Sequence, residues 1–303
     1  MKLYTLLHIS EDEKSTHNSF VKDFREQILV YLGCAKNLSG SLERCGIELT
    51  ILTNNLGYIN KISDYAQHMD IRELNFDFKV PSGINFYSAH FKIEVYKYLS
   101  NLKDEYVGIV DADILCINQI PLSLVNVILN KIPLYYDLTS QVTPAFGQEV
   151  VIHDKEFLGK YKSCGLWAGG ELMLGPPSFF DKVYQEISSI KERYFMNFSQ
   201  LHHQGDEMLL SVAIEKLLMS GEHILDAGSL NIIYRFWNAE TMHSQIPVED
   251  IKTKFFIHLP SDKHFISALK KEQIYKGEIY SRYAKHLQLT RIKGRLKKLL
   301  LMR

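Results

Sequence analysis

The sequence predicts an α/β domain built on a mainly parallel, mixed sheet with helices on its faces, followed by a basic helical tail. Three observations support this prediction. Apolar runs of strand length alternate with amphipathic segments of helical period from residue 2 to residue 259. Hydrophobic residues make up 46% of the 303 residues, which is enough for a full core. Residues 107–110 form an uninterrupted apolar run, as in a strand covered on both faces. We place the α/β domain at residues 1–265 and the tail at residues 266–303.

In the first half of the chain, each element is predicted from a change of hydrophobic period. Strands are expected over residues 2–9 and 47–53, and the turn pair Asn54-Asn55 closes the second one. A helix over residues 14–42 joins them, because its apolar residues recur near a period of 3.6. A second helix, over residues 89–102, leads directly into the buried strand.

The second half of the chain continues the alternation of strands and helices. Strands are expected over residues 132–138, 166–174 and 255–259. Helices are expected over residues 178–194 and 206–219, the first of them opened by a Pro-Pro pair. Each strand is followed by a connection long enough for a crossover, which favours parallel pairing.

Cysteine content and hydropathy restrict the class of protein. The sequence has no C-x-x-C pair, so we expect reduced thiols of a cytosolic protein and neither a disulfide frame nor a zinc site. No stretch of 18 apolar residues occurs, and residues 1–7 are too short for a signal peptide. The four cysteines are Cys34, Cys45, Cys116 and Cys164.

The formal net charge of zero conceals an acidic body and a basic tail. Residues 282–303 contain eight Lys or Arg and no acid, which leaves 27 basic and 35 acidic residues, a net charge of −8, in the rest of the chain. Apolar residues recur at helical spacing between these cations, at Leu289, Ile292, Leu296, Leu299 and Leu300. Such a helix can lie on an anionic membrane surface, which predicts peripheral attachment to the inner face of the cytoplasmic membrane. The alternative is a helix docked on its own domain. Nucleic acid is not an expected partner, because the body is acidic.

Two carboxylates, Asp111 and Asp113, follow the buried strand. An Asp-x-Asp pair is weak evidence alone, since about one is expected by chance among 15 Asp in 303 residues. Its place raises its value, because ligands of open α/β sheets bind at the carboxyl ends of strands. Burying both carboxylates costs several kcal/mol unless a cation meets them. A divalent metal that holds a diphosphate is the economical partner.

His258 and Lys263 suggest the other side of such a site. His258 leaves a short apolar strand, and Lys263 follows five residues later. Carboxylate oxygens with one imidazole nitrogen suit Mn²⁺ or Mg²⁺, with phosphate oxygens completing the coordination. The alternative is that His258 is a hydrogen-bonded core histidine.

Two further segments carry residues of functional interest. Gly169 and Gly170 interrupt a strand, where small residues let a ligand approach the backbone. A β-bulge or a tight helix–sheet crossing would explain them equally. Asp206 and Glu207 open a helix, where acids are favoured by the helix dipole and could also orient an acceptor hydroxyl or stabilise a cationic sugar.

In this order the segments resemble the GT-A glycosyltransferases, and within them the bacterial lipopolysaccharide galactosyl- and glucosyltransferases of family eight. The resemblance covers roughly residues 1–265 and rests on five short motifs. These are His90-Phe91-Lys92, Val110-Asp111-Ala112-Asp113, Trp167-Ala168-Gly169-Gly170, Gly205-Asp206-Glu207 and the segment from His258 to His264.

The resemblance implies a transferase that moves a sugar from a nucleotide-sugar to a saccharide or glycolipid acceptor. The donor that the resemblance implies is a UDP-sugar. It implies that Asp111, Asp113 and His258 hold Mn²⁺ or Mg²⁺, which acts as a Lewis acid. Donor contacts would come from Lys92, Asp111, Asp113, Gly169, Gly170 and Lys263. Asp206 and Glu207 would be the catalytic acids, near the reacting carbon in a retaining enzyme or as general base in an inverting one. The resemblance favours retention.

Two other functions remain compatible with the sequence. A nucleotidyltransferase can share such a sheet and acidic metal site, but residues 8–20 lack the Gly-rich basic loop expected for a triphosphate. A binding module that has lost catalysis is disfavoured by the retention of all three candidate metal ligands.

Overall fold

The computed structural model describes residues 1–10, 21–238 and 241–301, with side chains described as far as residue 293. Its centre is a seven-stranded sheet in the order β3-β2-β1-β4-β7-β6-β8. Only β7 runs against its neighbours β4 and β6 among the described pairs, so the predicted mainly parallel, mixed sheet is confirmed. The strands of this sheet are β1 (Lys2–Leu7), β2 (Glu48–Thr53), β3 (Asp70–Glu73), β4 (Val107–Val110), β6 (Leu134–Asp137), β7 (Ala168–Gly175) and β8 (Leu225–Asp226).

A second sheet of three strands stands beside the carboxyl end of β4. Its order is β5-β10-β9, with β10 antiparallel to β5 and parallel to β9. The strands are β5 (Ile114–Cys116), β9 (Ile233–Arg235) and β10 (Phe256–His258). Because β5 follows β4 after three residues, the chain passes from one sheet to the other at Asp111 and Asp113.

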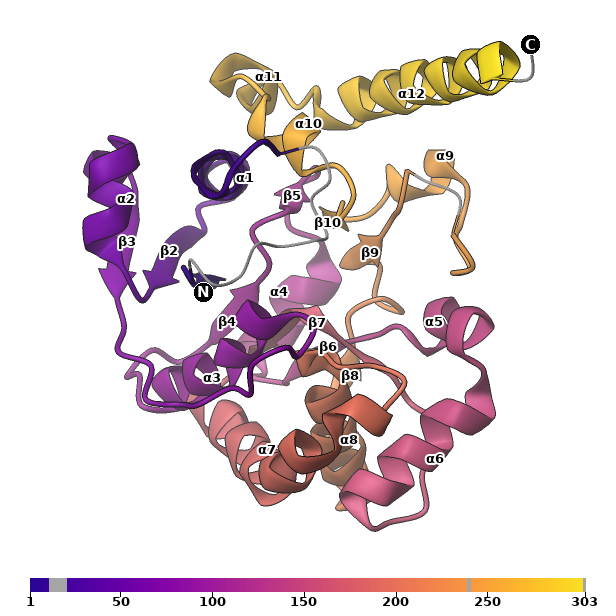
Figure 1. Cartoon of the computed structure of the whole chain (residues 1–303). Coiled ribbons are helices and arrows are strands. Elements are labelled where there is room, and N and C mark those ends of the chain that lie inside the picture. Colours follow the sequence, from indigo (N-terminus) through magenta and orange to yellow (C-terminus); the bar gives the residue numbers. More distant parts are fainter. Residues whose placement is uncertain (11–20, 239–240, 302–303) are drawn as a thin grey trace.

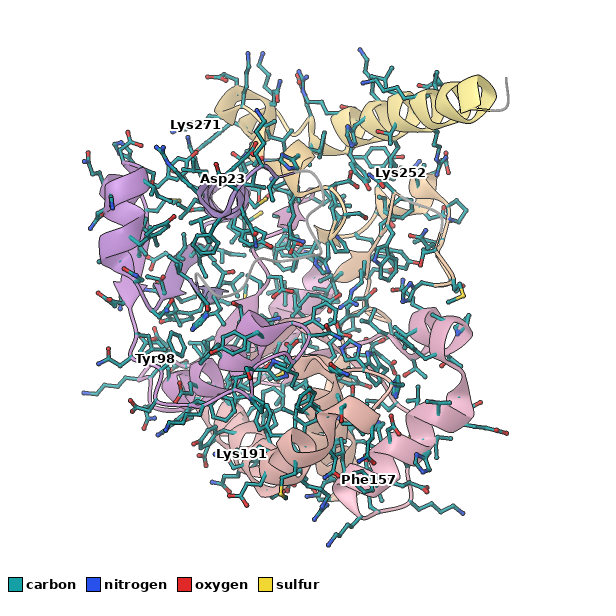
Figure 2. All side chains as sticks on the ribbon, viewed as in Figure 1. Asp23, Tyr98, Phe157, Lys191, Lys252 and Lys271 are labelled. Carbon is teal, nitrogen blue, oxygen red and sulfur yellow. The ribbon has the colours of Figure 1, made fainter. Side chains whose placement is uncertain are left out.

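Helices cover both faces of the large sheet. Figure 1 shows α1 on one side of it and α7 and α8 on the other, and Figure 2 shows side chains filling the space between these layers. The helices are α1 (Phe24–Glu43), α2 (Leu56–Ile62), α3 (Lys92–Ser100), α4 (Leu122–Leu129), α5 (Thr139–Phe146), α6 (Gln148–Gly159), α7 (Pro177–Asn197), α8 (Asp206–Met219), α9 (Val248–Ile251), α10 (Lys263–Ser267), α11 (Lys271–Tyr275) and α12 (Ile279–Leu301), with short 3₁₀ turns η1 (Tyr65–Gln67), η2 (Tyr87–Phe91) and η3 (Phe198–Gln200).

Two predicted helix starts are corrected by the structure. The first helix begins at Phe24, because Asp23 has extended backbone and its side chain accepts a hydrogen bond from Glu26 N, which makes it the N-cap. Residues 21–23 are therefore not helical, and residues 14–20 of that prediction lie outside the described part. The helix expected from residue 89 begins as a 3₁₀ turn, and regular α-helix starts only at Lys92.

The C-terminal segments pack on the domain at first and then leave it. Asn37 of α1 donates hydrogen bonds to the carbonyls of Ile266 and Leu269 at 2.6 and 3.1 Å. Tyr283 and Leu287 of α12 are buried, whereas Leu289 and Ile292 are 49% and 46% exposed. Figure 1 shows the rest of α12 projecting along the edge of the molecule. The predicted apolar positions Leu296, Leu299 and Leu300 lie outside the described side chains.

The described part of the chain holds all four cysteines as free thiols, Cys34 and Cys116 buried and Cys164 exposed. A search of the described helices finds none with the length and apolar character needed to cross a bilayer.

Candidate metal centre

The turn between β4 and β5 holds Asp111 and Asp113. Asp111 N donates to the carbonyl of Glu171 on β7 at 2.9 Å, and Ile114 N donates back to the carbonyl of Asp111 at 3.2 Å. The antiparallel register of β5 and β10 sets His258 opposite Ile114. As a result, one ligand atom from each of Asp111, Asp113 and His258 lies within 4.8 Å of the other two, the one such group of three that the described residues contain. The three residues predicted as metal ligands are thus brought together.

His258 is held by a carboxylate on each side of its ring. Its Nε2 lies 3.1 Å from Asp113 Oδ1 and its Nδ1 lies 3.1 Å from Glu171 Oε1. Burial alone would lower the pKa of His258, but Asp113 and Glu171 outweigh it and raise the pKa to about 9. The imidazole therefore carries a proton on both nitrogens at neutral pH.

Lys263 begins α10 beside the same carboxylate. Its Nζ lies 2.6 Å from Asp113 Oδ2 and donates to the carbonyl of Pro260 at 2.8 Å. Burial alone would raise the pKa of Asp113, but Lys263 and then His258 hold it well below its usual value. Asp113 is therefore ionised at any physiological pH.

Lys92, at the start of α3, joins the first carboxylate to the second acidic segment. Its buried Nζ lies 2.7 Å from Asp111 Oδ1 and 3.2 Å from Asp206 Oδ2, and donates to the carbonyl of Gly170 at 2.9 Å. Burial raises the pKa of Asp111 more than Lys92 lowers it. Lys92 is thus the cation that stabilises two neighbouring carboxylates, the partly exposed Asp111 and the buried Asp206.

The two strand glycines make room for side chains of the site. A Cβ at Gly169 would overlap the Glu171 carboxylate, and a Cβ at Gly170 would lie 2.5 Å from Asp206 Oδ2. The register of β6 against β7 shifts beside them, between Tyr135 and Tyr136, so the β-bulge weighed from the sequence is present. Protein carboxylates therefore occupy the space over these glycines.

Asp206 and Glu207 have different surroundings at the start of α8. Asp206 is buried and faces Lys92, whereas Glu207 accepts a hydrogen bond from Trp167 Nε1 at 2.9 Å and pairs with Arg235. Burial would raise the pKa of Glu207, but Arg235 outweighs it and lowers the pKa. Glu207 is accordingly an ionised partner of Arg235.

Glu171 and Arg235 belong to the site although the sequence analysis did not single them out. Glu171 is fully buried in β7, and its carboxylate takes a two-pronged ion pair from Arg235 of β9, with Nε 2.6 Å from Oε1. The signal was present: Glu171 is the one charged residue in an apolar strand, and such a residue needs a buried partner.

A cavity of about 730 Å³ opens at this cluster. Asp111, Asp113 and Lys263 line one end, and Ser10 and Tyr87 line another part. The cavity follows the carboxyl ends of β1 and β4, where the sheet order reverses and open α/β sheets bind ligands.

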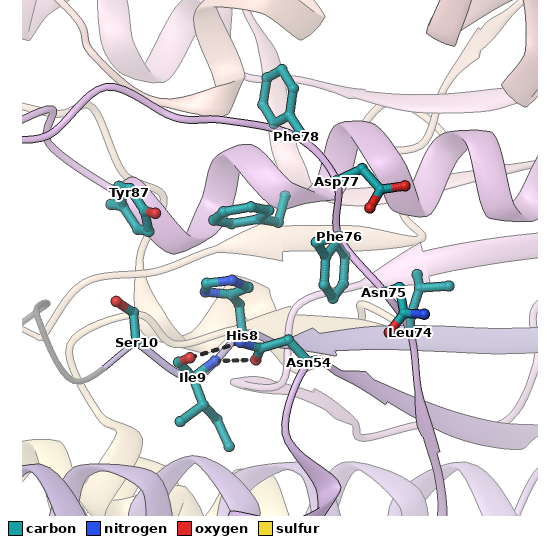
Figure 3. A pocket seen from close by; sticks show the side chains of 11 residues that line it. His8, Ile9, Ser10, Asn54, Leu74, Asn75, Phe76, Asp77, Phe78 and Tyr87 are labelled. Carbon is teal, nitrogen blue, oxygen red and sulfur yellow. Dashed lines mark hydrogen bonds between the residues drawn. The ribbon is translucent and has the colours of Figure 1, made fainter.

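A second cavity, of about 530 Å³, adjoins the first, and His8, Ser10 and Tyr87 line both (Figure 3). The ring of His8 stacks on Phe91 with centroids 3.7 Å apart. Burial lowers the pKa of His8 to about 4, so this ring is neutral at physiological pH. Asn54 is committed to the backbone of Ile9 through bonds of 2.7 and 2.8 Å. The wall of this second cavity is largely aromatic, and Asp77 is the charged side chain in it.

Comparison with known proteins gives structural neighbours and no sequence relatives. No protein-family model matches the chain, and no curated protein matches it by sequence. A crystal structure of galactosyltransferase LgtC in complex with donor and acceptor sugar analogs superposes with a TM-score of 0.55 at 13% identity, covering 91% of this chain and 95% of that one. The WbbM bifunctional glycosyltransferase superposes with a TM-score of 0.53 at 11% identity, covering 91% of this chain and 51% of that one. Superpositions at identities this low establish the fold alone. They confirm that this chain has the GT-A fold that its motifs predicted.

Proposed function

We propose that this chain is a metal-dependent glycosyltransferase that moves a sugar from a nucleotide-sugar, a UDP-sugar, to a saccharide or glycolipid acceptor. One observation carries the proposal: Asp111, Asp113 and His258 converge, and Asp111 and Asp113 line a cavity of about 730 Å³ together with the cation Lys263. The shared fold supports it, since LgtC has been crystallised with donor and acceptor sugar analogs.

The residues present fit a divalent metal. Two carboxylates and one imidazole are a donor set that Mn²⁺ and Mg²⁺ accept, and the cluster faces a cavity that leaves room for phosphate oxygens. Asp111, Asp113 and His258 would hold the ion, which would neutralise negative charge on the departing diphosphate.

The chain's own side chains would bind and orient the donor. Lys263, now paired with Asp113, is placed to donate to the diphosphate once a metal shares that carboxylate. The aromatic end of the cavities, at His8 and Tyr87, suits the nucleoside. Lys92 holds Asp111 and Asp206 in place, so its contribution to donor binding is indirect.

The surroundings of the two candidate acids favour retention of anomeric configuration. A general base for inversion needs a carboxylate that can take a proton from the acceptor. The negative charge of Glu207 is balanced by an ion pair with Arg235, and that of Asp206 by an ion pair with Lys92. Fixed, ionised carboxylates suit stabilisation of an oxocarbenium-like sugar better than proton abstraction. We place Asp206 nearer the reacting carbon, since it shares Lys92 with the ligand Asp111.

The test is a panel of nucleotide-sugars with Mn²⁺, scored by hydrolysis and by thermal shift. We expect one donor to give metal-dependent turnover that Asp113→Asn abolishes. Asp250→Asn, which changes an exposed acid on α9, should leave it intact. Absence of response to every nucleotide-sugar, with transfer of a nucleotide from a triphosphate, would support the nucleotidyltransferase instead. Silence with all donors would support the inactive binding module.

We further propose that α12 attaches the protein to an anionic membrane surface on its inner, cytoplasmic side. The half-exposed Leu289 and Ile292 lie next to the exposed cations Arg291 and Lys293. Vesicles with and without anionic phospholipid, mixed with full-length protein and with a chain ending at residue 288, test this idea. Equal binding by both chains would remove the tail from the membrane contact.

A further inference from the structure

Glu171 is the residue of the site whose placement calls for a function. It lies in the middle of β7, fully buried, where an apolar side chain would pack without cost. Gly169 leaves the space that its carboxylate fills, and the bulge of β7 turns this part of the strand. The strand is thus shaped around one carboxylate.

The Glu171 carboxylate contacts two residues that lie opposite each other on the neighbouring strands β9 and β10. Arg235 of β9 and His258 of β10 are paired residues in the small sheet, and both contact Glu171 across the gap to β7. Arg235 takes both oxygens of Glu171, which fixes the plane of the carboxylate. Glu171 Oε1 then lies 3.1 Å from Nδ1 of His258.

An ionised carboxylate can only accept a hydrogen bond, so each ring nitrogen of His258 carries a proton toward its carboxylate, Nδ1 toward Glu171 and Nε2 toward Asp113. Asp113 is a candidate metal ligand and Glu171 is not, so the proton on Nε2 is the one that a metal would displace. Nε2 points toward Asp113 at 3.1 Å and belongs to the cluster with Asp111. Histidines that bind metals usually donate their second N–H to a carboxylate or carbonyl, which fixes tautomer and ring orientation.

We propose that Glu171, fixed by Arg235, is the positioning residue for His258, selecting the tautomer that offers Nε2 to the metal. The inference rests on the proposed metal site and adds a residue behind it. The backbone carbonyl of Glu171 also holds Asp111 N at 2.9 Å, so one residue orients two of the three ligands.

The experiment measures the Mn²⁺ dissociation constant by calorimetry, without donor or acceptor. Glu171→Leu removes the acceptor and should weaken Mn²⁺ binding on the order of 10- to 100-fold. Glu171→Gln keeps an oxygen that can accept from Nδ1 and should recover most of that loss. Arg235→Lys keeps the charge but loses the two-pronged grip, and should give an intermediate loss.

The matched control is Glu215→Gln, another fully enclosed carboxylate, paired with Lys155 and without a contact to the three ligands in the described structure. It should leave the Mn²⁺ constant unchanged. Equal losses in Glu171→Leu and Glu215→Gln, or no loss in Glu171→Leu, would overturn the inference. Should Glu171→Leu not fold, equal constants for wild type, Glu171→Gln and Arg235→Lys would overturn it. If the wild-type protein binds no Mn²⁺, the proposed metal site itself fails.

Discussion

Replacing Lys92 by Met should lower the free energy of unfolding. We expect this loss because two carboxylates are left without their cation, and not because packing is lost. Lys92 Nζ lies 2.7 and 3.2 Å from two carboxylates, that of the partly exposed Asp111 and that of the buried Asp206. At an effective dielectric constant of about 20, these contacts correspond to gross Coulomb energies of about 6 and 5 kcal/mol. Most of this Coulomb energy offsets the cost of desolvating the three ions. Removing the cation from such a group should lower the free energy of unfolding by about 3–5 kcal/mol.

The assay is urea unfolding followed by circular dichroism, with Lys97→Met as control on the same helix. Lys97 is exposed, so its replacement should change the unfolding free energy by less than about 0.5 kcal/mol. Without Lys92 the pKa of Asp111, which Lys92 now lowers, rises further, so that Asp111 takes up a proton as pH falls. The deficit of Lys92→Met should therefore shrink between about pH 7 and pH 5. A deficit under about 1 kcal/mol, or one that does not change with pH, would refute the charge argument.

Three further predictions concern neighbouring parts of the structure. Glu207→Gln leaves Arg235 with one carboxylate and should cost stability on the order of 1–3 kcal/mol by urea unfolding, while a base role would instead show as lost turnover at unchanged stability. Lys155 holds the pKa of Glu215 down to about 2 against the effect of burial, so the unfolded chain binds more protons as pH falls from 4.5 through 2. Stability from this group is present above pH 4.5 and lost below it, by up to about 3 kcal/mol, and Glu215→Gln should flatten that loss in acid-unfolding curves. Gly169→Ala would displace the carboxylate beside it and should weaken Mn²⁺ binding in calorimetry, whereas Gly46→Ala, where no atom lies within 4 Å but φ is +67°, should affect stability only.

The sequence predicted the three candidate metal ligands because each of them stands where an apolar strand ends. Asp111 and Asp113 after β4, and His258 at the end of β10, are visible as polar residues where a hydrophobic run stops. The mainly parallel character of the sheet was predictable from the alternation of strands with helices, but the sequence did not identify β7 as the strand that runs antiparallel to its neighbours. What brings the ligands within 4.8 Å is the register of β5 against β10, which depends on residues far apart in the chain.

The second layer of the site could not be predicted for the same reason. Glu171 and Arg235 are 64 residues apart, and they meet only where β9 of the small sheet lies against β7 of the large one. The glycines of β7 were interpreted as space for a ligand, and the structure fills that space with carboxylates. The hydrophobic pattern of a sequence indicates which face of a strand is buried. It does not indicate which buried side chains contact one another.

The charges of the site account for how so many ionised groups can lie together. Ion pairs link five carboxylates with four cationic groups: Asp111, Asp113, Glu171, Asp206 and Glu207 with Lys92, Arg235, His258 and Lys263. With His258 protonated, five negative and four positive charges leave a net charge of −1.

Exchange of the proton on Nε2 for a divalent ion would bring that net charge to zero, so metal entry changes the charge of the cluster by one unit only. A cluster that is nearly balanced in both states need not unfold or rearrange to accept the ion. The ion pair of Lys263 with Asp113 is then the contact that metal binding weakens, because the carboxylate is shared, and Lys263 becomes available to an incoming diphosphate. Metal first and donor second is the binding order that this arrangement favours, and a donor that binds equally well without metal would contradict it.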